Sequence, residues 1–291
     1  MIYLILSVLC VASFTLLFKL FERYHIHTFQ AIVFNYWIAA ACGLFFIPAY
    51  SFSEIITSRW LLFAVALGAS FICVFTLVSQ TVKNFSVSAA TVSMKLGLVF
   101  PVIFAFLIYE EGYNNLKLIG IAIAFVAVIL ATYRKQGEHH HHTKLQYLLP
   151  FIVFVGSGLC DAGVQYANKE LLSDIDLAPF VTANFFSAAI IGTFVLTYQF
   201  IRKKAVLEWK NVLGGVAVGV PNYFSFLFML KALENMSWGS SVIFPVSNLS
   251  TIAISTVAAF ILFKERVSTI NLTGLAFAGA SIILIIISNY Y

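Results

Sequence analysis

Residues 260 to 274 read FILFKERVSTINLTG, and residues 106 to 120 carry a similar phrase, FLIYEEGYNNLKLIG. Each phrase places a short charged and polar stretch between two apolar runs, and each ends on a glycine. Charged residues make up only 10% of the chain. A charged phrase that returns at the same place in an apolar pattern therefore indicates an internal repeat.

The composition around these phrases is typical of an integral membrane protein. The 291 residues are 61% hydrophobic, include 30 Phe and have a mean hydropathy of +0.96. An ordinary globular domain is roughly 45 to 50% apolar and about 25% charged. Because a soluble core cannot bury so much apolar surface, we expect any function to be carried out within or across a bilayer.

Long apolar runs predict the membrane spans. About 20 mostly apolar residues cross a bilayer as a helix, and the chain has ten such runs. They are residues 2–20, 28–50, 60–82, 86–109, 117–133, 146–168, 177–201, 211–231, 238–263 and 268–289. Barrel strands would alternate polar and apolar residues over about ten positions, whereas these runs are longer and apolar on all sides. The predicted fold is an all-α integral membrane protein with ten transmembrane helices.

The charged phrases belong to a longer match between the two halves of the chain. At an offset of 154, residues 106–130 and 260–284 share eight identities in 25 positions. The identical pairs are Phe106 with Phe260, Glu111 with Glu265, Leu118 with Leu272, Gly120 with Gly274, Ala122 with Ala276, Ala124 with Ala278, Ile129 with Ile283 and Leu130 with Leu284. This match indicates a duplication.

The duplication extends to the front of each half, where SVLCVA at residues 7–12 resembles SGLCDA at 157–162. We therefore predict two five-helix repeats, residues 1–133 and 146–291, joined by a polar linker at 134–145. Five is an odd number, so the second repeat enters the membrane from the opposite side to the first. Such inverted repeats are typical of transporters whose halves rock around a site near the bilayer midplane.

In this arrangement the charged phrases are the turns between spans 4 and 5 and between spans 9 and 10. Glu111 and Glu265 are then structural residues of the two turns. Gly120 and Gly274 each stand four residues before an alanine, a pattern that lets membrane helices pack closely. We expect spans 5 and 10 to use these glycines for packing and to brace the structure at its periphery.

At these motifs the chain resembles the EamA branch of the drug/metabolite transporter superfamily. The signature is an apolar span end, a Glu, a short polar turn and a helix opening with x-x-G, which runs here from Glu111 to Gly120 and from Glu265 to Gly274. The resemblance implies a secondary transporter of small metabolites such as amino acids in the cell membrane. Transport would be proton-coupled or facilitated and usually outward, without nucleotide hydrolysis, cofactor or enzymatic activity.

Two ionisable residues lie deep inside predicted spans, Lys95 in span 4 and Asp161 in span 6. Charged groups there cost about 2.5 to 3.5 kcal/mol on insertion scales, and they usually face a cavity or a partner. Under one hypothesis both line a central cavity, where Lys95 meets a substrate carboxylate and Asp161 an amine or a coupling proton. The alternative is a structural ion pair between helices, or a lysine that extends to the interface.

Further binding candidates are polar side chains in four other spans. Asn35 and Asn184 are repeat mates, and each is the lone amide at its helix centre, where it would either bond across the bundle or contact substrate. Asn222 and Tyr223 follow a proline in span 8, and Asn248 follows a proline in span 9. Prolines free backbone carbonyls and permit hinges. Weaker candidates are Gln80, Gln165 and Trp37.

Basic residues and family resemblance predict opposite orientations. Twelve of the 17 Lys and Arg fall in connections 1-2, 3-4, 5-6, 7-8 and 9-10, four fall on the opposite face, and Lys95 lies inside a span. The positive-inside rule then puts both termini outside the cytoplasm, whereas the resemblance puts them inside. The sequence leaves both orientations open, and it names neither the substrate, the coupling ion, the direction of transport nor the oligomeric state.

Two rival function classes explain less of the pattern. An integral-membrane enzyme acting on lipid or lipid-linked substrate needs an acidic or histidine cluster near an interface, but the connections offer isolated acids such as Asp174, Asp176 and Glu208. A receptor or scaffold needs no cavity, and neither rival explains an inverted duplication. The HHHH tract at residues 139–142 is interpreted as a solvated linker rather than a metal site. The expected partners are a small-molecule substrate, a proton and the lipid bilayer, with no nucleic acid.

Overall fold

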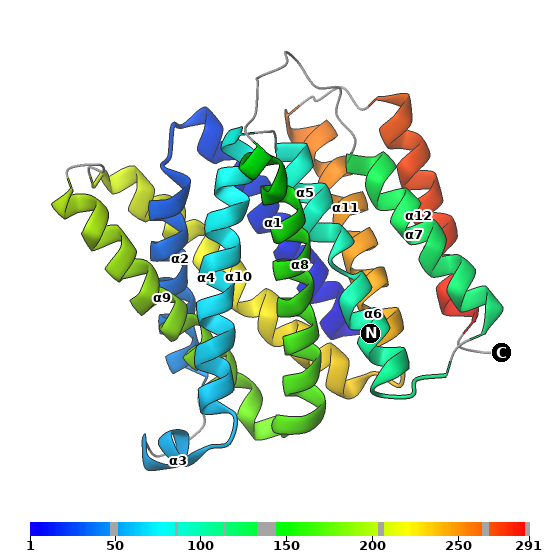
Figure 1. Cartoon of the computed structure of the whole chain (residues 1–291), viewed down its shortest axis with the longest axis horizontal. Coiled ribbons are helices and arrows are strands. Elements are labelled where there is room, and N and C mark those ends of the chain that lie inside the picture. Colours follow the sequence, from blue (N-terminus) through cyan, green and yellow to red (C-terminus); the bar gives the residue numbers. More distant parts are fainter. Residues whose placement is uncertain are drawn as a thin grey trace. The chain divides into compact units, whose positions relative to one another are not determined.

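A computed structural model of the protein describes residues 1–46, 52–84, 87–112, 114–132, 144–202, 207–263 and 268–288. Within these ranges every regular element is a helix, as the all-α prediction requires. The α-helices are α1 (Ile2–Arg23), α2 (Thr28–Leu44), α3 (Phe52–Thr57), α4 (Leu61–Asn84), α5 (Val87–Leu96), α6 (Val99–Leu107), α7 (Asn115–Thr132), α8 (Lys144–Tyr166), α9 (Leu177–Ile201), α10 (Trp209–Asn235), α11 (Ser240–Phe263) and α12 (Thr269–Ile287) (Figure 1). A π-helix, η1 (Ala167–Leu171), and a 3-10 helix, η2 (Asp174–Asp176), connect α8 to α9.

Six stretches of the described helices are long and apolar enough to cross a membrane. They are Leu61–Val78, Leu148–Leu171, Leu177–Ile201, Trp209–Asn235, Ser240–Ala258 and Thr269–Ile287. Shorter apolar helices, Ile2–Ser13, Thr28–Leu44, Ser93–Leu107 and Asn115–Leu130, occupy the positions of predicted spans 1, 2, 4 and 5. The all-helical membrane fold is therefore confirmed, while the count of ten spans stays a prediction.

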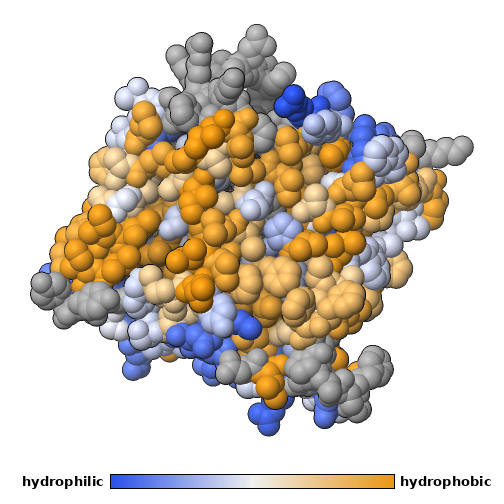
Figure 2. Space-filling view, turned by 180° about the vertical axis from the view of Figure 1, so that it is seen from behind, coloured by the Kyte–Doolittle hydropathy of each residue, from blue (hydrophilic) through white to orange (hydrophobic). Residues whose placement is uncertain are grey.

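Large apolar side chains are exposed along the helices, and much of the face drawn in Figure 2 is hydrophobic. Leu62 is 81% exposed, Phe194 is 73% exposed, and Ile261 is 66% exposed. Soluble monomers rarely expose contiguous apolar patches larger than a few hundred Å². Helices satisfy their own backbone hydrogen bonds, so such a surface is stable against lipid tails.

The chain divides into two compact units, and each unit draws on both halves of the sequence. Unit 1 consists of Met1–Cys73 and Tyr166–Glu234, and unit 2 consists of Val74–Gln165 and Asn235–Tyr291. Unit 1 contains α1, α2, α3, α9 and most of α10, unit 2 contains α5, α6, α7, most of α8, α11 and α12, and α4 contributes to both. Three pairs of predicted repeat mates, α2 with α9, the broken span α5 and α6 with α11, and α7 with α12, thus share a unit.

In unit 1 the predicted mates α2 and α9 pack against each other in antiparallel orientation. Gly43, near the end of α2, faces Thr182 near the start of α9, and a Cβ on this glycine would lie 2.0 Å from the Thr182 Oγ1. At the other end, a Cβ on Gly192 would lie 2.9 Å from Cγ2 of Val33. Both contacts are too close for a side chain, so glycine allows the two helices to approach.

In unit 2 the predicted mates α7 and α12 also lie side by side (Figure 1). The amide of Asn114, just before α7, donates to the carbonyl of Ser288, just after α12, at 2.8 Å. The amide of Asn271 in the first turn of α12 donates to the carbonyl of Leu130 near the end of α7, at 3.1 Å. The two helices therefore run in opposite directions, which is the relation that an inverted duplication requires of mates.

Small residues lie along the contact between α7 and α12. A Cβ on Gly120 would lie 2.7 Å from Cγ1 of Ile285, and the Gly120 carbonyl accepts a hydrogen bond from Ser281 Oγ at 2.7 Å. Gly274 and Ala278 are buried on α12. Gly120 thus lies in a contact that has no room for a larger side chain.

The stretch predicted as one span at 86–109 is two helices, because α5 ends at Leu96 and α6 begins at Val99. Pro101 has no N–H to donate to the carbonyl of Gly97. That carbonyl instead accepts a hydrogen bond from the N–H of Phe100, three residues later, at 3.0 Å, which makes a narrower turn than that of an α-helix. The corresponding helix of the second half, α11, runs without a break, so the two halves are kinked unequally.

Candidate functional site

The seven predicted binding residues fall into two clusters, one in each unit. Lys95, Asp161 and Asn248 belong to unit 2, whereas Asn35, Asn184, Asn222 and Tyr223 belong to unit 1.

In unit 2, Lys95 and Asn248 are hydrogen-bonded across two helices. The Nζ of Lys95 donates to Oδ1 of Asn248 on α11 at 3.0 Å. Lys95 stands in the last turn of α5, just before the break in span 4. The carbonyls at a helix C-terminus carry partial negative charge, so this position favours a cation.

Asp161 supplies the negative charge of the same cluster. It lies on α8, and its carboxylate and the Lys95 ammonium are close enough to interact electrostatically. Among the described residues, no group donates a hydrogen bond to this carboxylate, and no cation lies within the 4.0 Å of an ion pair. The carboxylate therefore keeps its acceptor capacity for another group.

The break in span 4 lets α8 approach this cluster closely. A Cβ on Gly97 would lie 2.7 Å from Oγ of Ser157 and 2.8 Å from the backbone nitrogen of Gly158. The Ser157 hydroxyl lies 3.3 Å from the Met94 carbonyl, one of the carbonyls at the end of α5. An ammonium, a carboxylate and an interrupted helix thus come together within the apolar helices of unit 2.

In unit 1, Asn35 and Asn222 form an amide pair. The Asn222 Nδ2 donates to Oδ1 of Asn35 at 3.1 Å, which joins α10 to α2. Glycines make this approach possible, because a Cβ on Gly215 would lie 2.4 Å from Cβ of Phe34 and a Cβ on Gly219 would lie 2.9 Å from the carbonyl of Asn35. The pair joins residues that are 187 positions apart in the sequence.

Asn184, the repeat mate of Asn35, bonds elsewhere in unit 1. Its Nδ2 donates to the carbonyl of Ala64 on α4 at 3.4 Å. Gly68, one turn further along α4, is so close that a Cβ there would lie 2.3 Å from the Asn184 carbonyl oxygen. Both mates therefore make polar contacts between helices in this structure, with different partners.

Tyr223 is fully buried in an aromatic cluster of unit 1. Its ring stacks on Phe46 with 6.1 Å between centroids and lies 6.5 Å from the Phe185 ring. Gly43 is also in contact with it, since a Cβ there would lie 2.9 Å from Cε2 of Tyr223. In this conformation Tyr223 is a core residue.

Glu111, predicted as a turn residue, caps the start of α11. One carboxylate oxygen accepts bonds from the backbone nitrogen and hydroxyl of Ser240 at 2.9 and 2.6 Å, and the other accepts them from Ser241 at 3.0 and 2.7 Å. Gly239 leaves room for this contact, because a Cβ there would lie 2.3 Å from Oε2 of Glu111. Glu265, the predicted counterpart of Glu111, lies outside the described residues, as do the HHHH tract and most of the linker.

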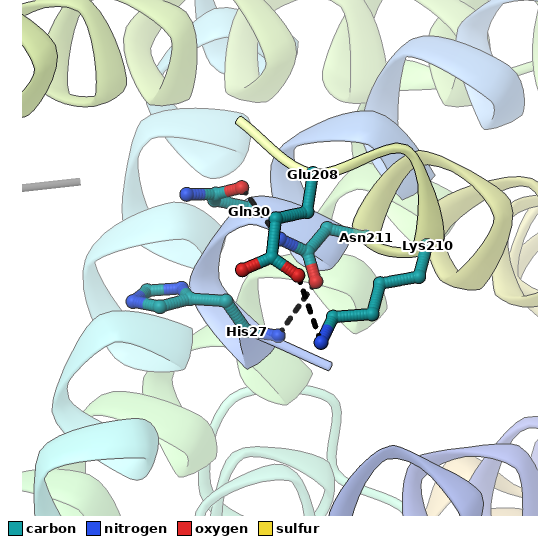
Figure 3. A network of polar contacts seen from close by, with 5 residues as sticks. All are labelled: His27, Gln30, Glu208, Lys210 and Asn211. Carbon is teal, nitrogen blue, oxygen red and sulfur yellow. Dashed lines mark hydrogen bonds and ion pairs between the residues drawn. The ribbon is translucent and has the colours of Figure 1, made fainter. Parts of the chain in front are cut away.

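A polar cluster that sequence analysis did not single out joins α2 and α10 in unit 1 (Figure 3). Oδ1 of Asn211 accepts a bond from the backbone nitrogen of His27 at 2.8 Å, and its Nδ2 donates to Oε1 of Gln30 at 2.7 Å. Figure 3 also shows the ion pair of Glu208 and Lys210, at 2.8 Å. Asn211 and Gln30 are buried at the helix ends, so this cluster positions α10 against α2.

Gln165 on α8, which the sequence indicates only as a weaker binding candidate, is buried in unit 2 and hydrogen-bonded to another helix. Its side chain is 1% exposed, and its Nε2 donates to Oγ of Ser240, the same hydroxyl that bonds Glu111. The available signal was its spacing, because Gln165 follows Asp161 by four residues and lies on the same helix face.

Residues 1–133 match the model of the EamA-like transporter family. This half of the chain is therefore similar to EamA-like transporters. Over these residues the match confirms the resemblance that the sequence predicts, which is a likeness to a family of membrane transporters.

A relative and a solved structure match nearly the whole length. A curated protein of Haemophilus influenzae, named "Uncharacterized protein", is 28% identical over 288 residues, which is 96% of this chain and 95% of the relative. A solved structure described as "Crystal structure of protein" superimposes with a TM-score of 0.78 and 12% identity, over 99% of this chain and 97% of the other. At that identity the likeness shows the fold alone.

Proposed function

We propose that the protein is a secondary transporter that moves small organic metabolites such as amino acids across the cell membrane by alternating access, chiefly outward. The proposal extends the family-level finding to substrate class, direction and mechanism. A proton gradient is the proposed driving force.

The observation that carries the proposal is the cluster of Lys95, Asn248 and Asp161 in unit 2. An ammonium and a carboxylate inside apolar helices are costly, and such groups usually serve a substrate or ion pathway. The Asp161 carboxylate accepts no hydrogen bond from the described residues, so it is available to a ligand or a proton. In the proposed mechanism Lys95 binds a substrate carboxylate, and Asp161 binds an amine or carries the coupling proton.

The broken helix of span 4 supports the same role. Discontinuous helices in transporters present backbone carbonyls and helix ends to substrates and coupling ions. Here the interruption begins at Gly97, two residues after Lys95, and Ser157 packs against it from α8. A cluster on such a break can change geometry without unfolding a long helix.

The antiparallel mates support alternating access. Both α2 with α9 and α7 with α12 are antiparallel, as two inverted five-helix repeats demand. We propose that the ten spans form these repeats and that Asn35, Asn184, Asn222 and Tyr223 contribute to the transport path from unit 1.

Uptake into proteoliposomes tests the proposal. The purified protein is assayed with a pooled set of labelled amino acids and other metabolites, with and without an imposed pH gradient, beside Asp161→Asn and Lys95→Met. The matched control is Glu110→Gln, an exposed acid outside both clusters. Accumulation that follows the gradient in wild type and control, and disappears in both cluster variants, is expected. Equilibration that ignores the gradient would make the protein a facilitator, and the absence of flux for every pool member would contradict transport of this class.

A further inference from the structure

Gln165, near the C-terminal end of α8, has an unusual hydrogen-bonding state. Its side chain is 1% exposed, and its Nε2 donates to Oγ of Ser240 on α11. Within the described part of the chain nothing donates to its Oε1, although this oxygen is buried. A buried carbonyl oxygen without a donor costs free energy, so a partner for it is expected in some state of the protein.

The orientation of this amide follows from its neighbours. The Ser240 hydroxyl has one proton, and it donates this proton to the Glu111 carboxylate at 2.6 Å. Bonds to a charged acceptor are about twice as strong as neutral ones. The Ser240 oxygen must therefore accept from Gln165, which turns the amide nitrogen toward Ser240 and leaves Oε1 facing away. A flipped amide would set two acceptors against each other.

Asp161 is the chemical complement of this orphan oxygen. It stands four residues earlier on α8, and residues at this spacing are neighbours on one helix face, with about 5–6 Å between Cβ atoms. An ionised carboxylate only accepts hydrogen bonds, so it cannot satisfy Gln165. A protonated carboxyl has an O–H donor, and nothing else in the described chain bonds to the Asp161 carboxylate.

We propose that Gln165 is a positioning residue for the protonated form of Asp161, an inference that rests on the proposed role of Asp161 in transport. When Asp161 takes a proton from water, its O–H donates to Oε1 of Gln165. When it loses the proton, its charge is stabilised by the Lys95 ammonium instead. Gln165 thus fixes the position of the neutral carboxyl, and Lys95 stabilises the ionised carboxylate in a different position.

The geometry links this exchange to α11 at two points. Near the start of that helix, Ser240 joins Gln165 to Glu111, and two turns later Asn248 holds Lys95. With the proposed bond between Asp161 and Gln165, and with α11 connecting Ser240 to Asn248, these residues form a closed circuit. A change in the protonation of Asp161 would therefore act on α11 at two points.

The charged groups around this circuit come from three elements. Lys95 of α5 interacts with Asp161. Glu111, in the turn before α7, lies beyond Ser240. Lys117 in the first turn of α7 interacts with Glu111 and donates to the Gly112 carbonyl at 3.0 Å. The Glu111 carboxylate accepts four hydrogen bonds, and the Lys117 ammonium donates to the Gly112 carbonyl. Of the two acids, Asp161 is therefore the one whose carboxylate can still accept hydrogen bonds.

Infrared difference spectroscopy tests the proposal without any substrate. Spectra of the full-length protein in lipid are recorded between alkaline and acidic pH, and the C=O stretch of protonated Asp161 is identified by its loss in Asp161→Asn. In Gln165→Leu the carboxyl loses its acceptor, so this band is expected to move to higher wavenumber. Gln165→Met, which keeps the length and flexibility of the side chain, is the second variant, and Gln199→Leu on α9 is the matched control.

Each outcome decides the question. A shifted band in both Gln165 variants and an unchanged band in Gln199→Leu support the positioning role. A band that stays in place in the Gln165 variants, or the absence of any Asp161 band, would overturn it. Failure of the transport assay would leave these spectra unaffected, so the two proposals are tested separately.

Discussion

Glu111 accepts two hydrogen bonds from Ser240, one from its backbone nitrogen at 2.9 Å and one from its hydroxyl at 2.6 Å. Ser241 bonds the second carboxylate oxygen in the same way. Backbone N–H groups in the first turn of a helix have no partner within the helix, and its dipole favours a negative charge there. The turn between spans 4 and 5 is therefore attached to the start of α11 by one side chain.

We predict that Glu111→Gln destabilises the protein. The amide keeps one acceptor but loses the charge and the second set of bonds, and the donors left behind cost about 1–3 kcal/mol. Thermal unfolding of the purified protein in detergent measures the effect. Glu110→Gln is the matched control, because Glu110 is exposed and a surface change of this kind is expected to stay within about 0.5 kcal/mol. Equal melting temperatures for the two variants would contradict the capping role.

A glycine contact in unit 1 gives a second prediction. In Gly68→Ala the new Cβ would lie 2.3 Å from the Asn184 carbonyl oxygen, a backbone atom that cannot move aside easily. Such overpacking costs about 1–3 kcal/mol. Gly279→Ala on α12 is the control, because nothing lies within 4 Å of its Cβ position. The control is expected to keep or raise the melting temperature, since alanine favours helix by up to about 1 kcal/mol.

The helices could be predicted because apolar length alone determines where a chain crosses a bilayer. The predicted span 177–201 coincides with α9, Leu177–Ile201. The break in span 4 was harder to predict, because Pro101 indicates that the helix is kinked but not at which residue it is interrupted. The close approach of Gly97 to α8 accompanies the break at 97–98, and that approach is a contact between residues about 60 positions apart.

The partners of the predicted site residues were not predictable, because single-sequence patterns report local periodicity and not long-range contact. Glu111 and Ser240, which are hydrogen-bonded, are 129 positions apart in the sequence, and Lys95 and Asn248 are 153 positions apart. The duplication offered the one long-range signal in the sequence. It paired Asn35 with Asn184, which lie on the packed helices α2 and α9, but it did not predict their hydrogen-bond partners, Asn222 for Asn35 and the Ala64 carbonyl for Asn184.

The inverted arrangement makes a third prediction, on topology. The turn between spans 4 and 5 and the turn between spans 9 and 10 should lie on opposite faces of the membrane. In a background without the native cysteines, Gly112→Cys and Ser268→Cys place single thiols at exposed positions of these two turns. Only one of them is expected to react with a membrane-impermeant maleimide in intact cells, and both after permeabilisation. The thiol that reacts first also decides the orientation of the termini, and simultaneous labelling of both would contradict the inverted repeat.

The fourth prediction separates a transport site from a structural ion pair at Lys95 and Asp161. Lys95→Met removes the cation that interacts with Asp161 and the donor to Asn248, so we expect a loss of stability of about 1–3 kcal/mol. Adding Asp161→Asn neutralises the remaining charge and should restore part of that stability, because a charge left without its partner costs more than a missing pair. Transport in proteoliposomes should nevertheless be lost in the double variant. Recovery of both stability and transport would make the pair structural, since only a site needs the charges themselves.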